Sequence, residues 1–505
     1  MLATESLAQK ALAISLGLFL FGQLFVGGNT LDVVLLSAGW SVAVLLLAIC
    51  VQLSGSHRAR AQGALVAALL GVSLLAVSGI VGLTTLPSER WQALPGHDFY
   101  INAERVLRTV IGDSTPLAIS LDPPGTVRAL LALAPAFAIF VAGSLLKRSL
   151  LLKVLGVSVV IAVAQAVFGI VQIGFGTPTI LSLDTAAGGN RASGTFINKN
   201  HYATLLAMHL PLVLMRAAGQ FTFFKSHDEP STLSNVWWGV AAALIVAALV
   251  ASLSRAGATA GLIVALITLA LCGSRKQFHS QRIVFVLSGL LAIMLAWLSN
   301  LDRLIASMTG SVITESALGR QLMNEYTFLG AQSFWPLGAG FGSYSIAFQR
   351  FQTPELIGFI DYAHNDYAQL IFETGAVGVV VLLCFAMAGV VTAINLIKHG
   401  ITATRVSPAV GCLLGAIAFA IHAWFDFPAH IPGVAMVVCL LLAASTNDAL
   451  VNVRPRPASL HDRSADGPTT GHRKRHPLKT GEDTTAPITL QPNPWITRPG
   501  DTEKT

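Results

Sequence analysis

The stretch LDVVLLSAGWSVAVLLLAICVQL, from Leu31 to Leu53, decides the fold class of this chain. It holds one charged residue, Asp32, and is otherwise almost continuously apolar. The hydrocarbon layer of a bilayer is roughly 30 Å thick and an α-helix rises about 1.5 Å per residue, so about 20 apolar residues cross it. This stretch therefore predicts a membrane-spanning helix.

The rest of the chain repeats this pattern. Of its 505 residues, 53% are hydrophobic and only 11% are charged, whereas soluble domains average about 25% charged residues. Because so little polar surface cannot cover a soluble fold, we predict an all-α, polytopic transmembrane helical bundle of about 12 helices. The predicted spans are Ala11–Val26, Leu31–Leu53, Gly63–Leu83, Val127–Leu146, Leu150–Phe175, Tyr202–Ala217, Val236–Leu253, Ala256–Cys272, Ile283–Leu298, Leu370–Ile397, Ala409–Trp424 and Ile431–Ala444.

Lysine and arginine residues gather in the connections that follow even-numbered spans. Cationic loops stay cytoplasmic during insertion, so this alternation predicts that both termini lie inside the cell. No cleavage pattern follows the run that begins near Lys10, and we expect a retained helix rather than a signal peptide. The cations of these inner connections are Arg58, Arg60, Lys147, Arg148, Lys153, Arg216, Lys225, Arg275, Lys276, Arg282, Lys398 and Arg405.

The cysteines argue against a disulfide framework, and the distribution of charge argues against nucleic-acid binding. All five cysteines fall within apolar runs, which predicts free buried thiols rather than a disulfide framework. The net charge of +7 comes largely from the inner connections and the last 60 residues, so anionic lipid explains it better than nucleic acid. The cysteines are Cys50, Cys272, Cys384, Cys412 and Cys439.

Three outer segments are too long to be simple turns: 84–126, 176–201 and 300–369. Long loops on a rigid scaffold commonly carry function. In the first segment an apolar face predicts a helix lying on the membrane surface, and in the third an apolar repeat predicts a helix. These positions are Ala103, Val106, Leu107, Val110 and Ile111 in the first, and Leu318, Leu322, Tyr326 and Leu329 in the third.

The composition changes after residue 446, where Pro, Thr, Arg, Lys, His and Asp replace apolar residues. Such a composition cannot bury a core. We therefore predict one transmembrane domain over residues 1–446 and a disordered cytoplasmic tail over residues 447–505.

The densest polar cluster runs from Asn190 to Tyr202, directly before the sixth span. Interfacial cations and amides often only anchor a helix, and an isolated Arg191 would fit that role. The density of the cluster exceeds what anchoring needs. Its candidate functional residues are Arg191, Asn198, Lys199, Asn200 and His201.

A second feature is the short outer turn Ser254-Arg255-Ala256-Gly257 between two apolar spans. A charge at such depth costs about 3 kcal/mol unless it faces a cavity or a partner, so Arg255 is a candidate functional residue. The structural alternative is an arginine that extends its charge to the interface.

A third feature, Asp361 to Gln369, enters the tenth predicted span. Imidazole titrates near neutral pH, so His364 is the natural candidate base for a sugar hydroxyl, with Asp361 or Asp366 orienting it. The simpler alternative makes His364 a polar helix cap. Asn365 and Asp366 are further candidates for substrate binding.

Two weaker patterns remain. His422, Asp426 and His430 lie at a spacing that hints at a metal, but so few ligands on one turn favour hydrogen bonds within the fold instead. The glycines from Gly338 to Gly342 resemble a phosphate-binding loop, yet no strand precedes them and no Lys-Ser or Lys-Thr follows, which indicates a backbone turn.

Together these motifs resemble the O-antigen ligase and polymerase superfamily of bacterial envelope proteins. The motifs appear in the family's order and cover roughly Gly176 to Pro428. They are Gly194-Thr-Phe-x-Asn198-x-Asn200-His201, Ser254-Arg255-x-Gly257, Gly319-Arg320, Pro336-Leu-Gly338-x-Gly340, Ala363-His364-Asn365-x-Tyr367-x-Gln369 and His422-x-x-x-Asp426-Phe427-Pro428, the last resembling the polymerase branch.

The resemblance implies glycan transfer from a polyprenyl-diphosphate carrier to an acceptor hydroxyl on the periplasmic side of the inner membrane. It implies no metal, nucleotide or other cofactor. Arg191 and Arg255 would bind the diphosphate, Arg320 would contribute to substrate binding, and His364 would activate the acceptor. Fixed guanidinium groups suit this task because a departing diphosphate develops negative charge.

Several functions remain open at this point. The leading one is polymerisation of lipid-linked repeat units, followed by ligation of glycan to a lipid A core and by transfer to protein hydroxyls. A transporter or flippase is the alternative of another class. A transporter would place ionisable groups near helix midpoints, whereas the candidate residues here map to one face.

Overall fold

The computed structural model describes residues 7–26, 31–53, 63–111, 117–174, 191–224, 231–273, 282–298, 305 and 311–451. Within these residues the chain is mostly helical, and all twelve predicted spans overlap helices. Seven described helices are long and apolar enough to cross a membrane. They are α2 (Leu31–Leu53), α3 (Gly63–Gly82), α6 (Pro123–Leu145), α7 (Arg148–Gly174), α9 (Thr232–Ala251), α10 (Arg255–Gly273) and α17 (Ala376–His399).

Five further helices coincide with predicted spans but fall short of that criterion. Four are apolar: α1 (Leu7–Val26), whose described side chains run only to Gly22, and the shorter helices α12 (Arg282–Leu298), α18 (Pro408–Ala423) and α19 (Pro432–Thr446). The fifth, α8 (Lys199–Ala217), is less apolar because it holds polar residues such as His201, Thr204 and His209.

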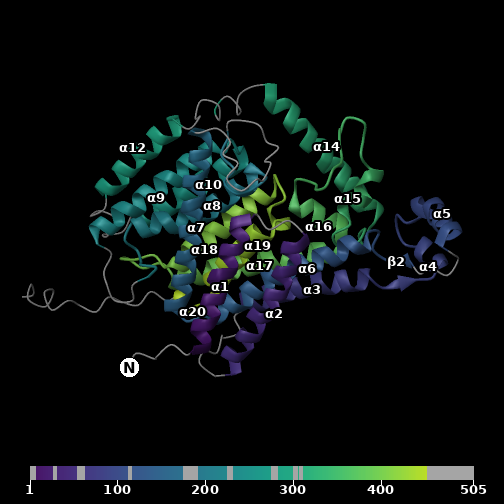
Figure 1. Ribbon diagram of the computed structural model, residues 1–505, viewed down its shortest axis with the longest axis horizontal. Coiled ribbons are helices and arrows are strands. Elements are labelled where there is room, and N and C mark those ends of the chain that lie inside the picture. Colours follow the sequence, from purple (N-terminus) through teal and green to yellow (C-terminus); the bar gives the residue numbers. More distant parts are fainter. Residues whose placement is uncertain are drawn as a thin grey trace, which may run out of the picture. The chain divides into compact units, whose positions relative to one another are not determined.

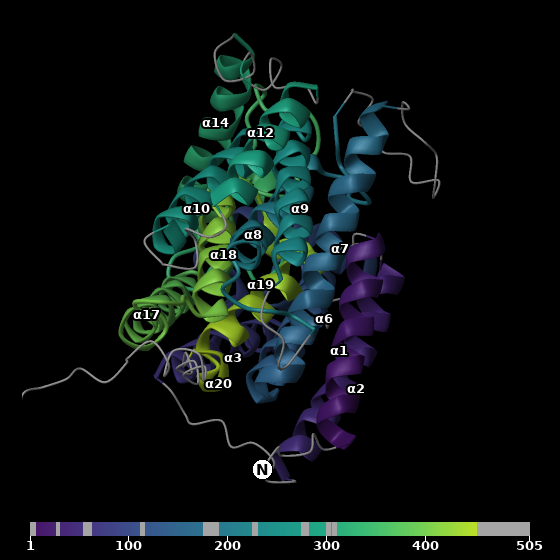
Figure 2. The same cartoon turned by 90° about the vertical axis from the view of Figure 1, so that its left-hand side faces the viewer.

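The centre of the helix bundle is α8, which contacts α9, α10 and α18. Figure 2 shows α8, α18 and α19 between α10 on one side and α7 on the other. Nearly every side chain of α8 is buried. Because protein rather than lipid surrounds this helix, its polar side chains find partners that a lipid-facing helix would lack.

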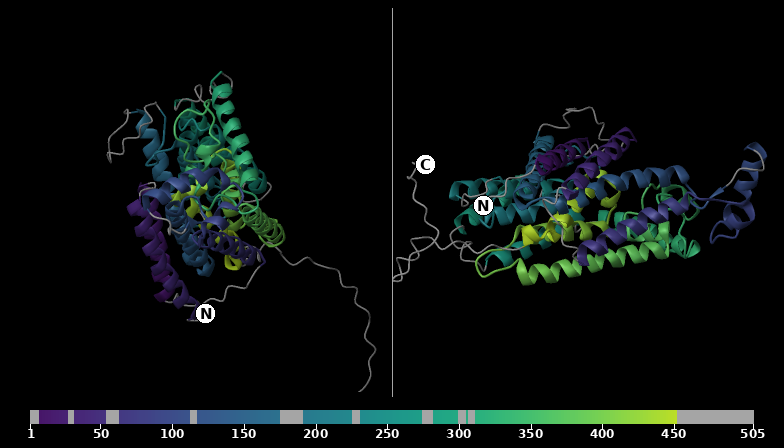
Figure 3. Two further views of the ribbon diagram at one scale, coloured as in Figure 1. Left: turned by 90° about the vertical axis from the view of Figure 1, so that its right-hand side faces the viewer. Right: turned by 90° about the horizontal axis from the view of Figure 1, so that it is seen from below.

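The outer helices pack in pairs and expose apolar side chains. α3 lies along α17, α2 along α6 and α12 along α9; the first of these pairs runs side by side in the right-hand view of Figure 3. Exposed leucines, isoleucines and valines cover α2, α12 and α17. Such surfaces suit a lipid environment.

The predicted span Leu370–Ile397 is wrong as a single helix. The chain forms α16 (Asp366–Thr374), breaks at Gly375 and continues as α17. Gly375 has a φ of 56°, and a Cβ there would collide with the Pro336 carbonyl. Only glycine fits this left-handed turn beside another backbone segment. The break assigns α16 to the outer segment rather than to the span.

The third outer segment folds around its own aromatic core. It contains α14 (Ser311–Ser333), α15 (Tyr344–Ala347) and the 3-10 turn η2 (Phe348–Arg350), followed by α16. The rings of Phe334, Tyr344, Phe348 and Phe372 form its buried centre. The helix predicted from the repeat at Leu318 is confirmed as part of α14.

The first outer segment forms short helices and a two-stranded sheet, and it contacts the third outer segment. It contains α4 (Ser88–Gln92), η1 (Asp98–Tyr100) and α5 (Ile101–Ile111), and an antiparallel pairing of β1 (Thr85–Leu86) with β2 (Leu117–Ala118). Figure 1 shows α4 and α5 far from α9 and α12. Arg350 donates to the Gly96 carbonyl over 2.8 Å, which joins the two outer segments. The predicted helix in the first segment is confirmed as α5.

The end of the bundle away from these segments gathers connections rich in cations. Arg148, at the start of α7, donates to the carbonyls of Ala449 and Leu450. Ser407, before α18, donates to the same Leu450 carbonyl over 2.6 Å. Residues 448–451 form the short helix α20 (Asp448–Val451), so helical structure continues past the predicted boundary at 446. The rest of the predicted tail, from residue 452, lies outside the described residues.

Candidate functional site

Residues 191–198, which precede α8, are held by two glutamines of α7. Gln172 accepts from the backbone N–H groups of Ser193 and Gly194 and donates to the Gly194 carbonyl. Two turns earlier, Gln165 accepts from the Thr195 N–H and donates to the Thr195 hydroxyl. Because the spacing of seven residues puts both amides on one helix face, α7 fixes this loop along its length.

Glycine is required at position 194 of this loop. Gly194 has a φ of 58°, and a Cβ there would collide with Gln165 Oε1 and with the ring of Tyr202. Tyr202 is fully buried and its hydroxyl donates to the Gln165 carbonyl over 3.1 Å. The loop therefore passes closer to α7 than any other residue would allow.

The turn between α9 and α10 brings Arg255 to the same place. The Ala192 N–H donates to the Ala251 carbonyl over 2.9 Å, and Lys199 Nζ donates to the Leu253 carbonyl over 2.7 Å. Leu253 has a φ of 53°, which turns the chain sharply before Arg255 opens α10. The predicted cluster Asn190–Tyr202 is thus joined to the residues directly before the predicted turn Ser254–Gly257.

Four cations share this region. Arg191, Arg255 and Arg320 all act electrostatically on the ammonium group of Lys199, and Arg320 also acts on Arg255. They come from the loop before α8, from α8 and α10, and from α14. Like charges held together repel one another unless an anion lies among them. This cluster, defined as Arg191, Lys199, Arg255 and Arg320, is therefore suited to bind a polyanion.

His364 lies beside the cation cluster and is paired with Asp426. Its Nδ1 is 2.9 Å from Asp426 Oδ1, while its ring packs edge-on against Phe427. The carboxylate is fully buried, whereas 31% of the His364 side chain is exposed. An ionised Asp426 can only accept, so His364 donates a hydrogen bond to it through Nδ1–H. Nε2 is then the unprotonated nitrogen of the ring and can accept a proton. Arg320 acts electrostatically on Asp426, which connects this pair to the cation cluster.

The ionised state of Asp426 follows from its neighbours. Burial opposes ionisation and would raise the pKa of Asp426, but the hydrogen bond from His364 and the nearby His201 and His422 hold that pKa at about 2. Asp426 is thus a carboxylate throughout the pH range in which proteins work. A fixed anion behind an imidazole is the arrangement that orients a general base.

Two more histidines surround the same carboxylate. His201 Nε2 lies 3.9 Å from Asp426 Oδ2, and His422 Nδ1 lies 2.7 Å from the Thr204 hydroxyl. Six buried polar atoms of the described residues lack a hydrogen-bond partner, and four of them belong to this site: His201 Nε2, His422 Nε2, Asp426 Oδ2 and Arg191 Nε. Orphaned buried polar atoms are rare and concentrate where function requires them. These four gather here in one region.

Three further predicted residues, Asn198, Asn365 and Asp366, have partners within the protein. Asn198 caps α8 by accepting from the Asn200 N–H, and Asn365 caps α16 in the same way while donating to Asn324. Asp366 contacts His430 and the Ala429 N–H, each over 2.9 Å. These side chains hold the site's backbone.

The structure shows the contacts of both weaker patterns. His422, Asp426 and His430 do bond within the fold, as predicted, through Thr204, His364 and Asp366 respectively. The glycine run is a backbone turn, as predicted, with positive φ at Gly338, Gly340 and Gly342. The N–H groups of these three glycines all donate to protein oxygens.

Sequence reasoning missed the partner of His364. Asp361 and Asp366 are close in sequence, but Asp361 is exposed and Asp366 bonds His430, whereas Asp426 lies 62 residues away and makes the bond. It also missed Gln165 and Gln172. Amides within an apolar span are a usable signal, because lipid offers them no partner.

Comparison with known proteins agrees with the motifs. Residues 240–383 match the family model described as O-antigen ligase. The predicted resemblance to the O-antigen ligase and polymerase superfamily is thereby confirmed, and the match indicates glycan transfer of the O-antigen ligase type. The matched region contains Arg255, Arg320 and His364, while Arg191 precedes it and Asp426 follows it. No curated protein matches the chain.

Proposed function

We propose that this protein transfers a glycan from a polyprenyl-diphosphate carrier to an acceptor hydroxyl, and that its reaction is polymerisation of lipid-linked repeat units. The observation that carries the proposal is the His364–Asp426 pair lying beside four cations. A base and a polyanion site that interact electrostatically, here through Asp426 and Arg320, are the two parts that such a transfer needs. A second feature, the family match, supports the same class of reaction.

The proposed reaction is a displacement at the anomeric carbon of the donor sugar. The acceptor hydroxyl loses its proton to His364 Nε2 as its oxygen bonds to that carbon. The bond from the carbon to the phosphate oxygen breaks, and the diphosphate leaves with the electron pair. The carrier brings its own activated leaving group, so the proposed reaction uses neither nucleotide nor metal.

In this proposal the cations bind the donor's head group. Arg191 and Arg255 hold the diphosphate, with Lys199 and Arg320 adding charge at its edge. Guanidinium groups bind phosphate oxygens with two parallel hydrogen bonds, which fixes the leaving group as its charge grows. Asn200, in the first turn of α8, and His201, which lies 3.9 Å from Asp426, are proposed to contact the glycan.

The proposed setting is the bacterial inner membrane, with about twelve spans, both termini in the cytoplasm and the site facing the periplasm. The distribution of cations along α8 supports this orientation. Lys199 begins α8 at the site, whereas Arg216 ends it and donates to Asn235 and Ser234. The connections at that second end carry the cations that topology rules assign to the cytoplasm.

A transporter or flippase fits the geometry less well. A substrate carried across the bilayer needs a site that both sides can reach. His209, further along α8, has both ring nitrogens bonded, to Ser158 and to the Leu205 carbonyl. It therefore serves the packing of α7 and α8. Four of the six orphaned polar atoms of the described residues belong instead to Arg191, His201, His422 and Asp426.

Reconstitution tests the proposed function directly. Purified protein in liposomes receives a synthetic polyprenyl-diphosphate trisaccharide, and products are resolved by mass spectrometry. The expected result is a ladder of glycans on the carrier, with release of free polyprenyl diphosphate. Failure to lengthen or transfer any glycan, while the protein remains folded, overturns the proposal.

Surface glycans of a deletion strain separate the alternatives. Single repeats on the normal acceptor indicate a polymerase, whereas long chains left on the carrier indicate a ligase. Polymerisation is preferred here because the sequence from His422 to Pro428 resembles the polymerase branch.

A further inference from the structure

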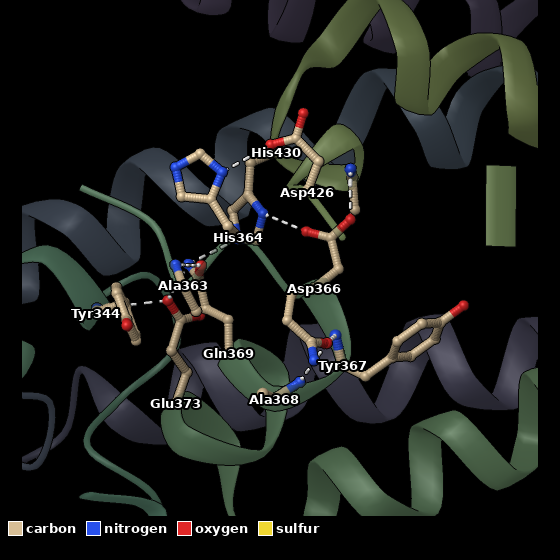
Figure 4. A network of polar contacts seen from close by, with 12 residues as sticks. Tyr344, Ala363, His364, Asp366, Tyr367, Ala368, Gln369, Glu373, Asp426 and His430 are labelled. Atoms are coloured by element: carbon tan, nitrogen blue, oxygen red, sulfur yellow. Dashed lines mark hydrogen bonds and ion pairs between the residues drawn. The ribbon is translucent and has the colours of Figure 1, made fainter. Parts of the chain in front are cut away.

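A second contact crosses the same two loops that the His364–Asp426 bond joins. Asp366 Oδ1 lies 2.9 Å from His430 Nδ1, and Asp366 Oδ2 accepts from the Ala429 N–H over 2.9 Å. His364 and Asp366 lie where the chain enters α16, and Asp426 and His430 lie in the connection between α18 and α19 (Figure 4). The two contacts run in parallel, so the Asp366–His430 contact limits how far the loops can separate.

Gln369 ties this second contact to the backbone of His364. Its Oε1 accepts from the N–H of Ala363, the residue before His364, over 3.0 Å. Its Nε2 donates to His430 Nε2 and to Glu373 Oε1, each over 3.0 Å. The oxygen and the nitrogen of the Gln369 amide therefore both have hydrogen-bond partners that fix its orientation. Because His430 Nε2 accepts, its ring proton lies on Nδ1 and is donated to Asp366.

Glu373 anchors the amide to the glycine turn. The carboxylate is buried and accepts from the Gly342 N–H over 2.8 Å and from the Tyr344 N–H over 3.4 Å. Tyr344 belongs to the aromatic core of the third outer segment. The chain of contacts thus runs from a rigid core, through Glu373 and Gln369, to the residue next to His364.

The backbone of His364 needs such support. Its φ of 51° lies in the left-handed region, which costs a residue other than glycine about 1–3 kcal/mol. Strained residues persist only when their surroundings fix them. Ala363 on one side is held by Gln369, and Asn365 on the other caps α16.

We propose that Gln369, together with the Asp366–His430 pair, positions His364 so that its Nδ1 meets Asp426. This inference rests on the proposed function, since it assigns His364 as the base. Gln369, Asp366 and His430 are positioning residues that act through His364. Their loss lowers the turnover of bound substrate and spares the donor's affinity, which the cation cluster provides.

The test compares Gln369→Leu with Thr327→Val in the liposome assay. Thr327 also makes a buried hydrogen bond, 2.8 Å to the Tyr344 hydroxyl, but Glu373 binds the backbone N–H of Tyr344, so loss of the hydroxyl contact leaves the route to His364 in place. Misplacing a reacting group costs up to about 100-fold in rate. Gln369→Leu is expected to lower kcat at least about 10-fold with KM for the donor within about 2-fold, and Thr327→Val to leave both unchanged.

A double-mutant cycle separates positioning from general damage. If Gln369 acts through the His364–Asp426 pair, Gln369→Leu costs less than about 2-fold in the Asp426→Asn background. Full additivity overturns the inference, as does equal turnover of the Gln369→Leu and Thr327→Val proteins. Wild-type protein that transfers no glycan would instead refute the proposed function.

A pair of His430 variants keeps the inference testable if Gln369→Leu fails to fold. The amide nitrogen of Asn lies close to the position of His Nδ1, so His430→Asn keeps the donor toward Asp366, whereas His430→Leu removes it. We expect His430→Asn to retain most of the turnover and His430→Leu to lose at least about 10-fold. Equal turnover of the two variants overturns the role of the Asp366–His430 pair.

Discussion

Replacing Asp426 by Asn tests the centre of the proposed site. Asn has nearly the same shape, and its carbonyl oxygen can still accept from His364 Nδ1, so the 2.9 Å contact is kept while the charge is lost. A hydrogen bond to a charged group contributes about 1.5–3 kcal/mol. If the loss of this roughly 1.5–3 kcal/mol affects the protein only when His364 takes up a proton, kcat falls about 10- to 150-fold.

The assay is steady-state transfer in liposomes over a range of donor concentrations, which gives both kcat and KM. KM for the donor should stay near its wild-type value, because the cation cluster is untouched. Asp361→Asn is the matched control, since Asp361 is exposed on the loop that carries His364. We expect this control to transfer at the wild-type rate. A wild-type kcat for Asp426→Asn, or an equal loss in Asp361→Asn, would refute the role given to Asp426.

Three further predictions follow from the same geometry. Arg191→Ala, Arg255→Ala and His364→Ala should each abolish glycan chain formation, while membrane insertion, measured by immunoblotting, stays normal. Glycans of wild-type length from all three variants would refute the proposed site. Gly194→Ala should lower the free energy of unfolding by at least about 1–3 kcal/mol, because a Cβ there meets α7, and a wild-type melting temperature in detergent would contradict this. Because the pKa of Asp426 is about 2 against an ordinary 3.8, its ionisation stabilises the folded state by about 2 kcal/mol above pH 4 and this contribution disappears as the pH falls through 2. The stability gap between wild type and Asp426→Asn should therefore narrow between pH 4 and pH 2 in chemical unfolding, and a constant gap counts against the assigned pKa.

The helices could be predicted because lipid imposes a simple rule on sequence. Apolar length alone located all twelve runs, and the boundaries of α2 agree at both Leu31 and Leu53. The same rule failed at Gly375. A hydropathy pattern continues smoothly through that residue, since the break depends on a positive φ and a neighbouring carbonyl that lie outside the pattern.

The candidate site divides along similar lines. Charged residues beside apolar spans made Arg191 and Arg255 candidates, because a charge there is costly unless it has a partner, and the chemistry of imidazole made His364 one. The partner of His364 could not be found in this way. Neighbours in sequence favoured Asp361 and Asp366, whereas the packing of α18 and α19 against α8 supplied Asp426.

The distance in sequence between His364 and Asp426 has a consequence for biosynthesis. The histidine leaves the ribosome before its carboxylate partner, and the segment holding that partner follows α18. A nascent chain that already carries all four cations therefore lacks the group that orients its base. If the proposed function holds, such a protein captures donor lipid during insertion without consuming it, and acquires turnover only when the segment after α18 docks.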